Sequence, residues 1–460
     1  MIKTIIKKEL LENVQNMRFP LFIMIIFGMM ITTGLFFINK YEQNQKEYRE
    51  GFFNNGRQLA ANNKSLSNLL SFEQTLTTTP NPLRIMVDGN ENVLPNSVQL
   101  SVMDLSNIEN TGSSNPFFLN SREIDITFIV QLIMSFIAII LTFNTVCGEK
   151  ENGTLRLSLS NPLPRDILLL GKYISSMIIL IIPFIIGTII DFIIISLSKS
   201  IVIDFSQWLN LAALVLVSVL YISIFVLLGI AVSAKCKSTT VSLVLLLLVW
   251  IGLVVLIPYN LGSILANKQY SIPTAAEIEN EAGRASREVV ESYPKEYGKN
   301  YDVGDPRNSR HVAMSMEAHK AAQTVLDNYR LKKINSVESI RNITRISPSA
   351  VYQYASEALA GTGLAHVKHF LRAVESYKND LASFFQEQDS RDPESQHLYY
   401  HPDYVSHKPF DPAAVPKFVE PSMGIAEGLH TALIDILILV LTNIILFAVA
   451  FVSFLRYDVR

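Results

Sequence analysis

The sequence predicts a mainly α-helical, polytopic membrane protein with six transmembrane helices, cytoplasmic N- and C-termini and two extracytoplasmic insertions. Three observations lead to this fold class. Hydrophobic residues make up 49% of the 460 residues, although the chain also contains long polar segments. Six apolar runs reach the roughly 20 residues that a helix needs to cross a bilayer. Lys and Arg gather in alternate short connections, as they do on the cytoplasmic side of membrane proteins.

The apolar runs and the short connections set the expected order of segments. The runs cover approximately 20–38, 124–146, 173–197, 209–231, 240–259 and 432–455. The connection 198–208 holds only Lys199, whereas the connections of opposite parity hold several basic residues, which places both termini in the cytoplasm. The expected domains are a cytoplasmic interfacial helix (1–18), a transmembrane helix (19–38), an extracytoplasmic α+β insertion (39–123), four transmembrane helices (124–260), an extracytoplasmic helical insertion (261–431) and the last transmembrane helix with a short cytoplasmic tail (432–460).

The first 18 residues form an amphipathic pattern. Ile2, Ile6, Leu10 and Val14 fall in one row four residues apart, and the charged residues occupy other positions. This spacing predicts a helix that lies along the membrane surface, with an ordinary cytosolic helix as the alternative. A cleavable signal peptide is not expected, because the leader carries two glutamates and no A-x-A site follows.

The two insertions differ in their expected structure. In the smaller one, residues 41–70 are helix-like, and residues 82–102 contain β-branched clusters divided by Asp88-Gly89-Asn90, which predicts a β-hairpin. The composition of the larger insertion predicts helices followed by an irregular stretch from 392 to 421. The helices are separated by proline or glycine at positions 273, 294, 306, 348, 361 and 363.

The connection 148–172 is the stretch around which the rest of the chain is organised. Glu149, Lys150 and Glu151 come first, and Leu155 and Leu159 then fall four residues apart. We expect a short surface helix over 149–159, with residues 152–154 as its turn or cap and a proline break after it. Because this helix is tied to the second and third spans, a force on it moves both. The alternative is an amphipathic loop that only lies on lipid.

Two groups of motifs carry a family resemblance. Residues 149–155, followed by 160–162 and 171–172, resemble the loop after the second span in ABC transporter permeases of the type-2 exporter class. Six spans with both ends inside is the plan of that class. Residues 346–350 and 361–363 resemble the branch with large extracytoplasmic insertions.

The resemblance implies that the short helix is a coupling helix, which docks on a separate ATPase subunit. Its glutamates would pair with basic groups and its leucines would fill a pocket. The residues expected to couple to the ATPase are Glu149, Glu151, Asn152, Gly153, Thr154, Leu155, Arg156 and Leu159. The expected partners are two ABC ATPase subunits, a second permease copy or a paralogue, and membrane lipid.

The function that this resemblance implies is ATP-driven export of a substrate across the cytoplasmic membrane of a prokaryote. The alternative is a mechanical relay, in which the extracytoplasmic domains act on an outside partner protein without moving substrate, as in the maturation of a metalloenzyme. A receptor or sensor without an ATPase is a third class, which needs no coupling helix. Failure of any ATPase to co-purify with the chain would favour it.

Catalysis by this chain is not expected. The sequence has no G-x-x-x-x-G-K-[ST] motif, because Gly171-Lys172 lacks the upstream glycine and the following hydroxyl, so ATP and magnesium are expected only in the partner ATPase. Metalloprotease and serine-hydrolase motifs are absent as well. The net charge of −2 gives no basis for nucleic-acid binding, and two cysteines cannot form a disulfide framework.

Asp191 lies within the third apolar run, where an ionisable side chain is costly unless it faces a cavity or a partner. It is therefore a candidate for the translocation path, and a position near the outer interface is the alternative. All eight histidines follow residue 310. Their spacing does not show the three or four converging ligands that a metal site requires, so we expect surface or helix-packing histidines, and the resemblance leaves metal binding as the alternative.

Overall fold

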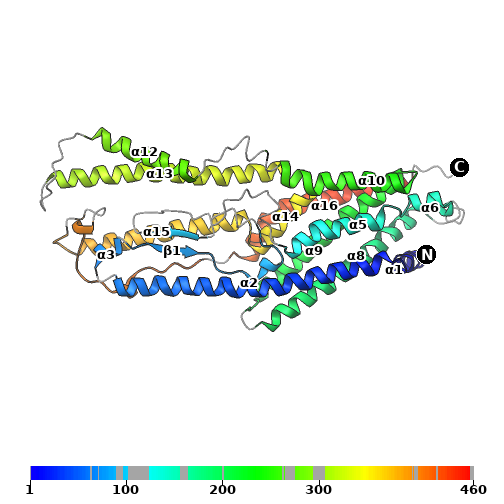
Figure 1. Cartoon of the computed structure of the whole chain (residues 1–460), viewed down its shortest axis with the longest axis horizontal. Coiled ribbons are helices and arrows are strands. Elements are labelled where there is room, and N and C mark those ends of the chain that lie inside the picture. The colour runs from blue at the N-terminus through cyan, green and yellow to red at the C-terminus, as the bar shows by residue number, and fades with distance from the viewer. Residues whose placement is uncertain are drawn as a thin grey trace.

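The computed structural model describes residues 2–62, 65–70, 72–89, 97–101, 124–155, 164–198, 201–261, 264, 275–293, 306–395, 397, 402–420 and 423–455. The molecule is elongated, with apolar helices packed together at one end and long polar helices at the other (Figure 1). We call the apolar end the bundle. We call the other end the stalk. It consists of residues 40–62, α3 (Leu66–Leu70), β1 (Gln74–Thr77), β2 (Ser97–Leu100), α12 (Ala275–Ser292), α13 (Pro306–Thr344), α15 (Leu364–Ser390) and residues 402–420.

Six helical segments within the described residues are long and apolar enough to cross a membrane, which confirms the six predicted spans. Two of them combine several helical types along one path. The spans are α2 (Arg18–Asn62); α4 (Ile126–Phe128) with η3 (Ile129–Met134), α5 (Ser135–Thr142) and α6 (Cys147–Glu151); α8 (Arg165–Leu197); α9 (Phe205–Lys235); α10 (Thr239–Trp250) with η4 (Ile251–Leu261); and α16 (Ile425–Leu455).

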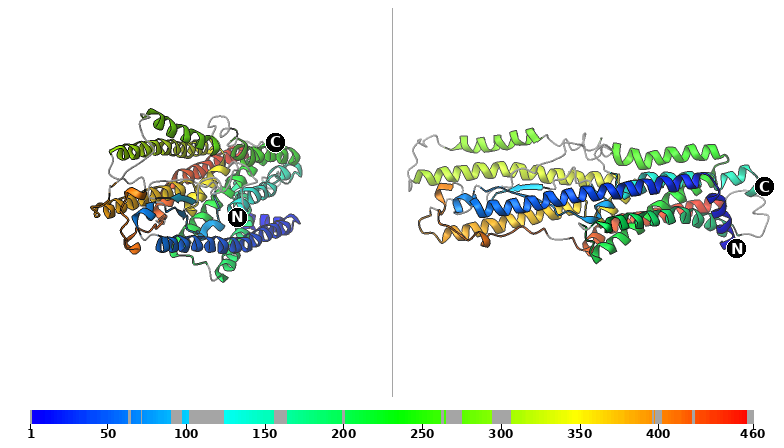
Figure 2. Two further views of the ribbon diagram at one scale, coloured as in Figure 1. Left: turned by 60° about the vertical axis from the view of Figure 1, so that its left-hand side comes forward. Right: turned by 60° about the horizontal axis from the view of Figure 1, so that its bottom comes forward.

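The predicted N-terminal helix is present as α1 (Ile2–Val14), and a three-residue turn separates it from α2. It packs against α8, at the same end of the bundle as α6 (Figure 1, Figure 2). The end of α16 lies there too, because Arg165 at the start of α8 donates a hydrogen bond to the Leu455 carbonyl at 2.7 Å. The first and last described residues therefore lie on one side, as an even number of spans requires. That this side is cytoplasmic stays a prediction.

The second and fifth spans contain π-helical turns, η3 and η4, that the sequence did not predict. In η3, the Gln131 side chain donates to the Ser349 carbonyl at 2.9 Å, and the Gln131 carbonyl accepts from the Tyr221 hydroxyl at 2.9 Å. Wider π turns leave backbone and side-chain groups free for such cross-helix bonds. These bonds join the second and fourth spans to the helix that follows residue 347.

That helix, α14 (Pro348–Ala360), is the joint between bundle and stalk. All of its residues are buried, and it packs against α9 and α16. Ser347 caps it by accepting from the Ser349 and Ala350 amides, and Pro348 occupies its first turn, where a missing N–H costs nothing. The ring of Tyr352 stacks on Tyr221 of α9, with centroids 4.5 Å apart. The stalk is thus anchored within the apolar core.

The smaller insertion differs from its prediction in two ways. Its helix is not separate from the first span, because α2 continues to Asn62 and is followed by α3 (Leu66–Leu70). The strand expected near residues 83–87 is wrong: residues 82–85 form the 3-10 helix η1 (Pro82–Ile85). The Asn81 side chain caps η1, and Leu83 and Ile85 are buried in the main core. The sheet instead pairs β1 (Gln74–Thr77) with β2 (Ser97–Leu100), antiparallel.

The larger insertion agrees with its prediction where the structure describes it. Its helices are α12 (Ala275–Ser292), α13 (Pro306–Thr344), α14 and α15 (Leu364–Ser390). Gly361 ends α14 in the left-handed conformation, with φ of +67°, which a glycine adopts without strain. The stretch after Asp392 contains only the short 3-10 helices η5 (Pro402–Tyr404) and η6 (Pro412–Ala414) among its described residues.

Candidate functional site

The candidate coupling segment begins with one helical turn, α6, at the end of the second span. Gly153 follows with φ of +69°, and Thr154 and Leu155 then return to helical conformation. The helix expected over 149–159 is therefore divided at Gly153, within the turn that the sequence placed at 152–154. Arg156 and Leu159 lie outside the described residues.

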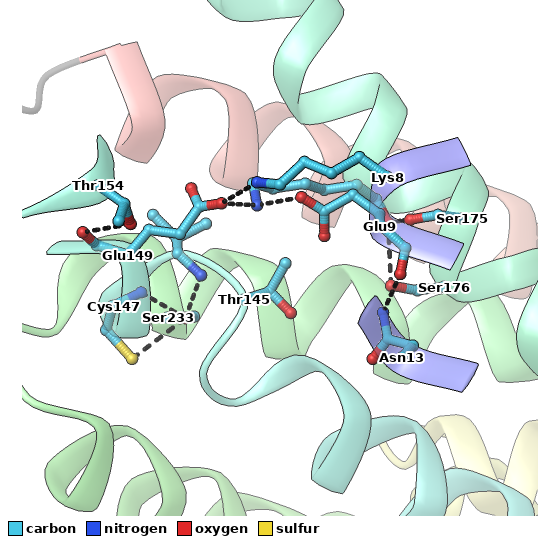
Figure 3. Close-up of polar contacts among 12 residues, drawn as sticks. Lys8, Glu9, Asn13, Thr145, Cys147, Glu149, Thr154, Ser175, Ser176 and Ser233 are labelled. Carbon is cyan, nitrogen blue, oxygen red and sulfur yellow. Dashed lines mark hydrogen bonds and ion pairs between the residues drawn. The ribbon is translucent and has the colours of Figure 1, made fainter. Parts of the chain in front are cut away.

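Glu149 binds two lysines, buried Lys172 and exposed Lys8, and Figure 3 shows its carboxylate beside Lys8. Its Oε1 lies 2.8 Å from Lys172 Nζ and 3.6 Å from Lys8 Nζ. Lys172 is buried, with 1% of its side chain exposed, and its Nζ also lies 2.8 Å from Glu9 Oε1. Two lysines and two glutamates balance in charge, and the buried charge of Lys172 is thereby paired, as buried charges in proteins normally are.

Close approach between α1 and α8 makes this ion cluster geometrically feasible. A Cβ added at Gly171 would lie 2.6 Å from Cγ2 of Ile5, closer than side-chain carbons can approach. The missing side chain at Gly171 thus lets α1 lie directly on α8, and Glu9, one turn after Ile5, reaches Lys172. The only buried residue of α1 is this glutamate rather than a member of the predicted apolar row.

Lys150 and its neighbours fasten α6 to the end of α9. The Lys150 ammonium donates to the carbonyls of Ala234 and Cys236, and the bond to Cys236 is 3.4 Å long. A cation at the end of a helix satisfies unpaired carbonyls and interacts favourably with the helix dipole. The Ser233 hydroxyl accepts from the amides of Val146 and Cys147, each at 3.0 Å.

Glu151 fastens α6 to the start of α10. Its Oε1 accepts from the Thr239 amide at 3.0 Å and its Oε2 from the Thr239 hydroxyl at 2.9 Å. A carboxylate at a helix N-terminus pairs with free N–H groups and with the positive end of the helix dipole. Three consecutive charged residues, Glu149, Lys150 and Glu151, therefore bind three different spans: α8, α9 and α10.

The exposed part of the segment is smaller than the sequence predicts. Glu151, Asn152, Gly153 and Thr154 are exposed, and a Cβ added at Gly153 would meet no atom of the described residues within 4 Å. Leu155 is fully buried and belongs to the main core. In this structure the Leu155 side chain is packed inside the chain, and its expected contact with a pocket on the ATPase stays a prediction.

Sequence reasoning missed four residues of this site: Glu9, Lys172, Ser233 and Thr239. A usable signal existed for two of them. Lys172 lies between two apolar stretches of α8, and Glu9 precedes Leu10 and Leu11 in α1. Each is therefore a charged residue in a segment that packs against apolar neighbours. That they pair with each other, across 163 positions, is visible only in the structure.

Asp191 is buried between the first and third spans. It has no exposed surface, and neither of its carboxyl oxygens has a hydrogen-bond partner among the described residues. A Cβ added at Gly34 of α2 would lie 2.8 Å from Asp191 Oδ1, so the carboxyl packs directly on the glycine backbone. The residue thus faces another helix of the same chain, and its role in a translocation path stays a prediction.

The histidines that the structure describes form no metal cluster. Among the described residues, no group of three or more His, Cys, Asp and Glu side chains could hold an ion. His366 instead pairs with Glu420, Nε2 to Oε1 at 3.1 Å, and Glu420 also accepts from the amide and hydroxyl of Thr79. This cluster ties α15 to residues on either side of the sheet.

Comparison with known proteins agrees with the fold. The model of the family described as ABC-2 family transporter protein matches residues 3–459. A stretch of 62 residues, 14% of this chain, is 40% identical to a Pseudomonas aeruginosa protein named probable ABC transporter permease protein NosY. That match covers 22% of the relative's length, so it compares only a part of each protein. Permeases of ABC transporters work with ATPase subunits. The chain belongs to the ABC-2 family of transporter proteins and is a multi-pass membrane subunit of an ABC transporter.

Proposed function

We propose that the chain is the permease of an ATP-driven exporter and that the exposed turn at 151–154 is where its ATPase subunit docks. The observation that carries this proposal is the set of bonds from Glu149, Lys150 and Glu151 to three different spans. A displacement of the turn is transmitted to α8, α9 and α10 through ion pairs and helix-end hydrogen bonds rather than through a flexible loop. ATP and magnesium would bind in the ATPase subunits, and this chain would contribute no catalytic group.

The assembly that this proposal implies has two ATPase subunits and two permeases, the second being another copy or a paralogue. When the ATPases close on ATP, each would push on one such turn. The ion cluster of Lys8, Glu9, Glu149 and Lys172 would make α1 and α8 move with it. The six spans would then rearrange as a unit and release substrate on the extracytoplasmic side.

Photo-crosslinking tests the docking. A photoreactive amino acid at Asn152, which is exposed beside Gly153, should crosslink to an ABC ATPase subunit when cells are irradiated. The matched control is Val202, which is 81% exposed in the connection at the opposite end of the bundle. Crosslinking of the ATPase from Val202 and not from Asn152 would refute the proposed docking side.

Two substitutions test the coupling. Gly153→Pro forces φ to about −65°, whereas the turn needs +69°, and Glu151→Lys places a cation on the N-terminus of α10. Both should lower permease-stimulated ATPase activity of the purified complex in vesicles while the chain still inserts. Gly153→Asn is the matched control, because asparagine tolerates a left-handed conformation. Full coupled activity in Gly153→Pro and Glu151→Lys would exclude this turn as the coupling site.

A mechanical relay is the second candidate, and the continuity of α2 favours it. This helix runs without interruption from Arg18 to Asn62, so a tilt of the first span becomes a displacement of the stalk. Spin labels on Asn54 of α2 and Lys320 of α13, both exposed, would report such a displacement. An ATP-dependent change in their distance, without cargo accumulating in inverted vesicles, would favour the relay over export.

A further inference from the structure

Asp191 is a buried acid that the coupling turn and the ion cluster do not use. Its side chain has no exposed surface, and neither carboxyl oxygen has a hydrogen-bond partner among the described residues. It lies on α8 beside Gly34 of α2, where an added Cβ would be 2.8 Å from Asp191 Oδ1. The carboxyl group is therefore enclosed between two spans, in contact with the backbone of the neighbouring helix.

The helices around Asp191 supply no charge of opposite sign along their apolar lengths. α8 packs against α1, α2, α5, α9 and α16. After Lys172, α8 itself contains no other Lys, Arg, His, Asp or Glu. These five residue types are also absent from the apolar lengths of three neighbouring helices: 19–39 of α2, 135–142 of α5 and 205–234 of α9.

The charged residues outside these lengths are paired with other groups or exposed. Lys40 of α2 is paired with Asp88 at 3.1 Å, and Asp435 of α16 is paired with Arg345 at 2.7 Å. The charges of α1 bind Lys172, which precedes Asp191 by about 30 Å along α8 at 1.5 Å per residue. Three further titratable residues, at the starts of α9 and α16, are exposed: Asp204, Glu427 and His430.

An isolated carboxylate in such a place is very unfavourable. Moving an ionised carboxyl group from water into apolar surroundings without a partner costs so much free energy that the group takes up a proton instead. A bound metal ion is not an alternative way to neutralise it, since no group of three or more His, Cys, Asp and Glu side chains converges within the part of the chain that the structure describes. The packed arrangement of α2 on α8 therefore requires the uncharged form of Asp191.

We propose that Asp191 is a proton-binding site, which carries a proton while α2 packs on α8 and releases it when the two spans separate. In the release step the O–H bond of the carboxyl group breaks, the proton passes to water, and a hydrated carboxylate remains. The route to water is short, because Asp191 lies six residues, about 9 Å, before the end of α8 at Leu197. Binding of the proton does not depend on the proposed function, whereas its release rests on the ATPase-driven rearrangement of the spans.

Infrared difference spectroscopy tests the binding on the full-length protein in a maltoside detergent, which has no carbonyl group of its own. A protonated carboxyl group absorbs at a higher frequency than a carboxylate or an amide. At pH 7 the spectrum of the wild-type protein minus that of Asp191→Asn should contain this band. Asp435→Asn is the matched control: Asp435 is ion-paired with Arg345, so the corresponding difference spectrum should lack the band.

A second pair of variants keeps the test decisive if Asp191→Asn does not fold. Gly34→Ala retains Asp191 but presses a methyl group on its Oδ1, so the band should shift in frequency. Gly28→Ala is the control on the same helix, because a Cβ there would meet no described atom within 4 Å and should leave the band unchanged. Absence of the band from the wild-type protein, its persistence in Asp191→Asn, or identical bands in Gly34→Ala and Gly28→Ala would each overturn the proton site.

A pH-indicator dye measures the release from the permease–ATPase complex in weak buffer. The complex is given a nucleotide analogue that is not hydrolysed, because hydrolysis itself liberates protons. The analogue should release a proton from the wild-type complex, and Asp191→Asn should abolish that release. Equal release from the two complexes would overturn the release step even where the band of Asp191 is present. Failure of the proposed function would be visible separately, as the absence of a crosslink from Asn152 to the ATPase.

Discussion

Replacing Lys172 with methionine tests the buried ion cluster that holds α1, α6 and α8 together. The substitution removes the ammonium that lies 2.8 Å from both Glu9 and Glu149. The two carboxylate oxygens can be no more than about 5.6 Å apart, because both contact the same nitrogen, which gives a repulsion of about 3 kcal/mol at an effective dielectric constant of about 20. Measured costs of breaking a buried ion pair, about 3–5 kcal/mol, agree with this value.

Alkylation of Cys147 offers an assay at the site itself. Cys147 is fully buried, and in a Cys236→Ser background it is the only thiol, since the chain has two cysteines. If the cluster holds this end of the bundle closed, its loss lowers the free energy of local opening by about 3 kcal/mol. Lys172→Met should therefore raise the alkylation rate of Cys147 about 100-fold or more.

Lys8→Met is the matched control for this assay. Lys8 lies 3.6 Å from Glu149, but 60% of its side chain is exposed, so its loss should change the rate only a few-fold. Glu9→Gln combined with Lys172→Met should recover part of the protection, because it removes one of the two repelling charges. Equal rates in Lys172→Met and Lys8→Met would show that the buried cluster does not hold this end closed.

Three further substitutions probe the bundle, each measured by thermal unfolding in detergent. Gly229→Ala should lower the free energy of unfolding by about 1–3 kcal/mol, because the added Cβ would lie 1.8 Å from Thr142 Oγ1. An unchanged free energy of unfolding would mean that α9 and α5 can move apart without cost. Asp435→Asn should destabilise by about 1.5–3 kcal/mol, because its two oxygens accept from Arg345 at 2.7 and 3.1 Å; unchanged stability would contradict a structural role for this pair. Asp191→Asn should be neutral or stabilising, because neither carboxyl oxygen has a described partner, and a loss as large as that of Asp435→Asn would point to an undetected partner.

The features that the sequence predicted correctly depend on local signals. Each span is a continuous apolar run, and the breaks at Pro306, Pro348 and Gly361 act on the residues next to them. The β-hairpin was misplaced because its strands are not adjacent. β1 is a short polar strand whose partner begins twenty positions later, and the apolar residues around Leu83 pack into the main core rather than into a sheet. Apolar patterning alone does not distinguish these two kinds of burial.

The sequence predicted the turn at 152–154, which the structure contains at Gly153, but not the contacts that surround it. Glu149 and Glu151 were expected to face a partner, since a charged loop between spans is normally solvated. In the structure Glu149 and Lys150 bond to other parts of the chain, and Glu151 is exposed while it bonds to Thr239. Glu9 and Thr239 lie too far away in the sequence for spacing to connect them with this loop. Only the packing of α1, α9 and α10 around α6 identifies their partners.

Because Glu149 and Lys150 bond to other helices of the same chain, they restrict how an ATPase subunit could be recognised. If Glu149 and Lys150 paired with a partner, their bonds to α8 and α9 would have to break first, and Lys172 would be left with Glu9 alone. We infer that docking leaves these bonds in place and uses the surface of residues 151–154, where the open space around Gly153 lets another backbone approach closely. In this inference Gly153 provides the surface that the ATPase contacts, and the bonds of Glu149 and Lys150 transmit the movement of the ATPase to the spans. Gly153→Pro should then weaken binding of the ATPase, whereas Lys172→Met should leave binding intact and weaken only the effect of the ATPase on the spans.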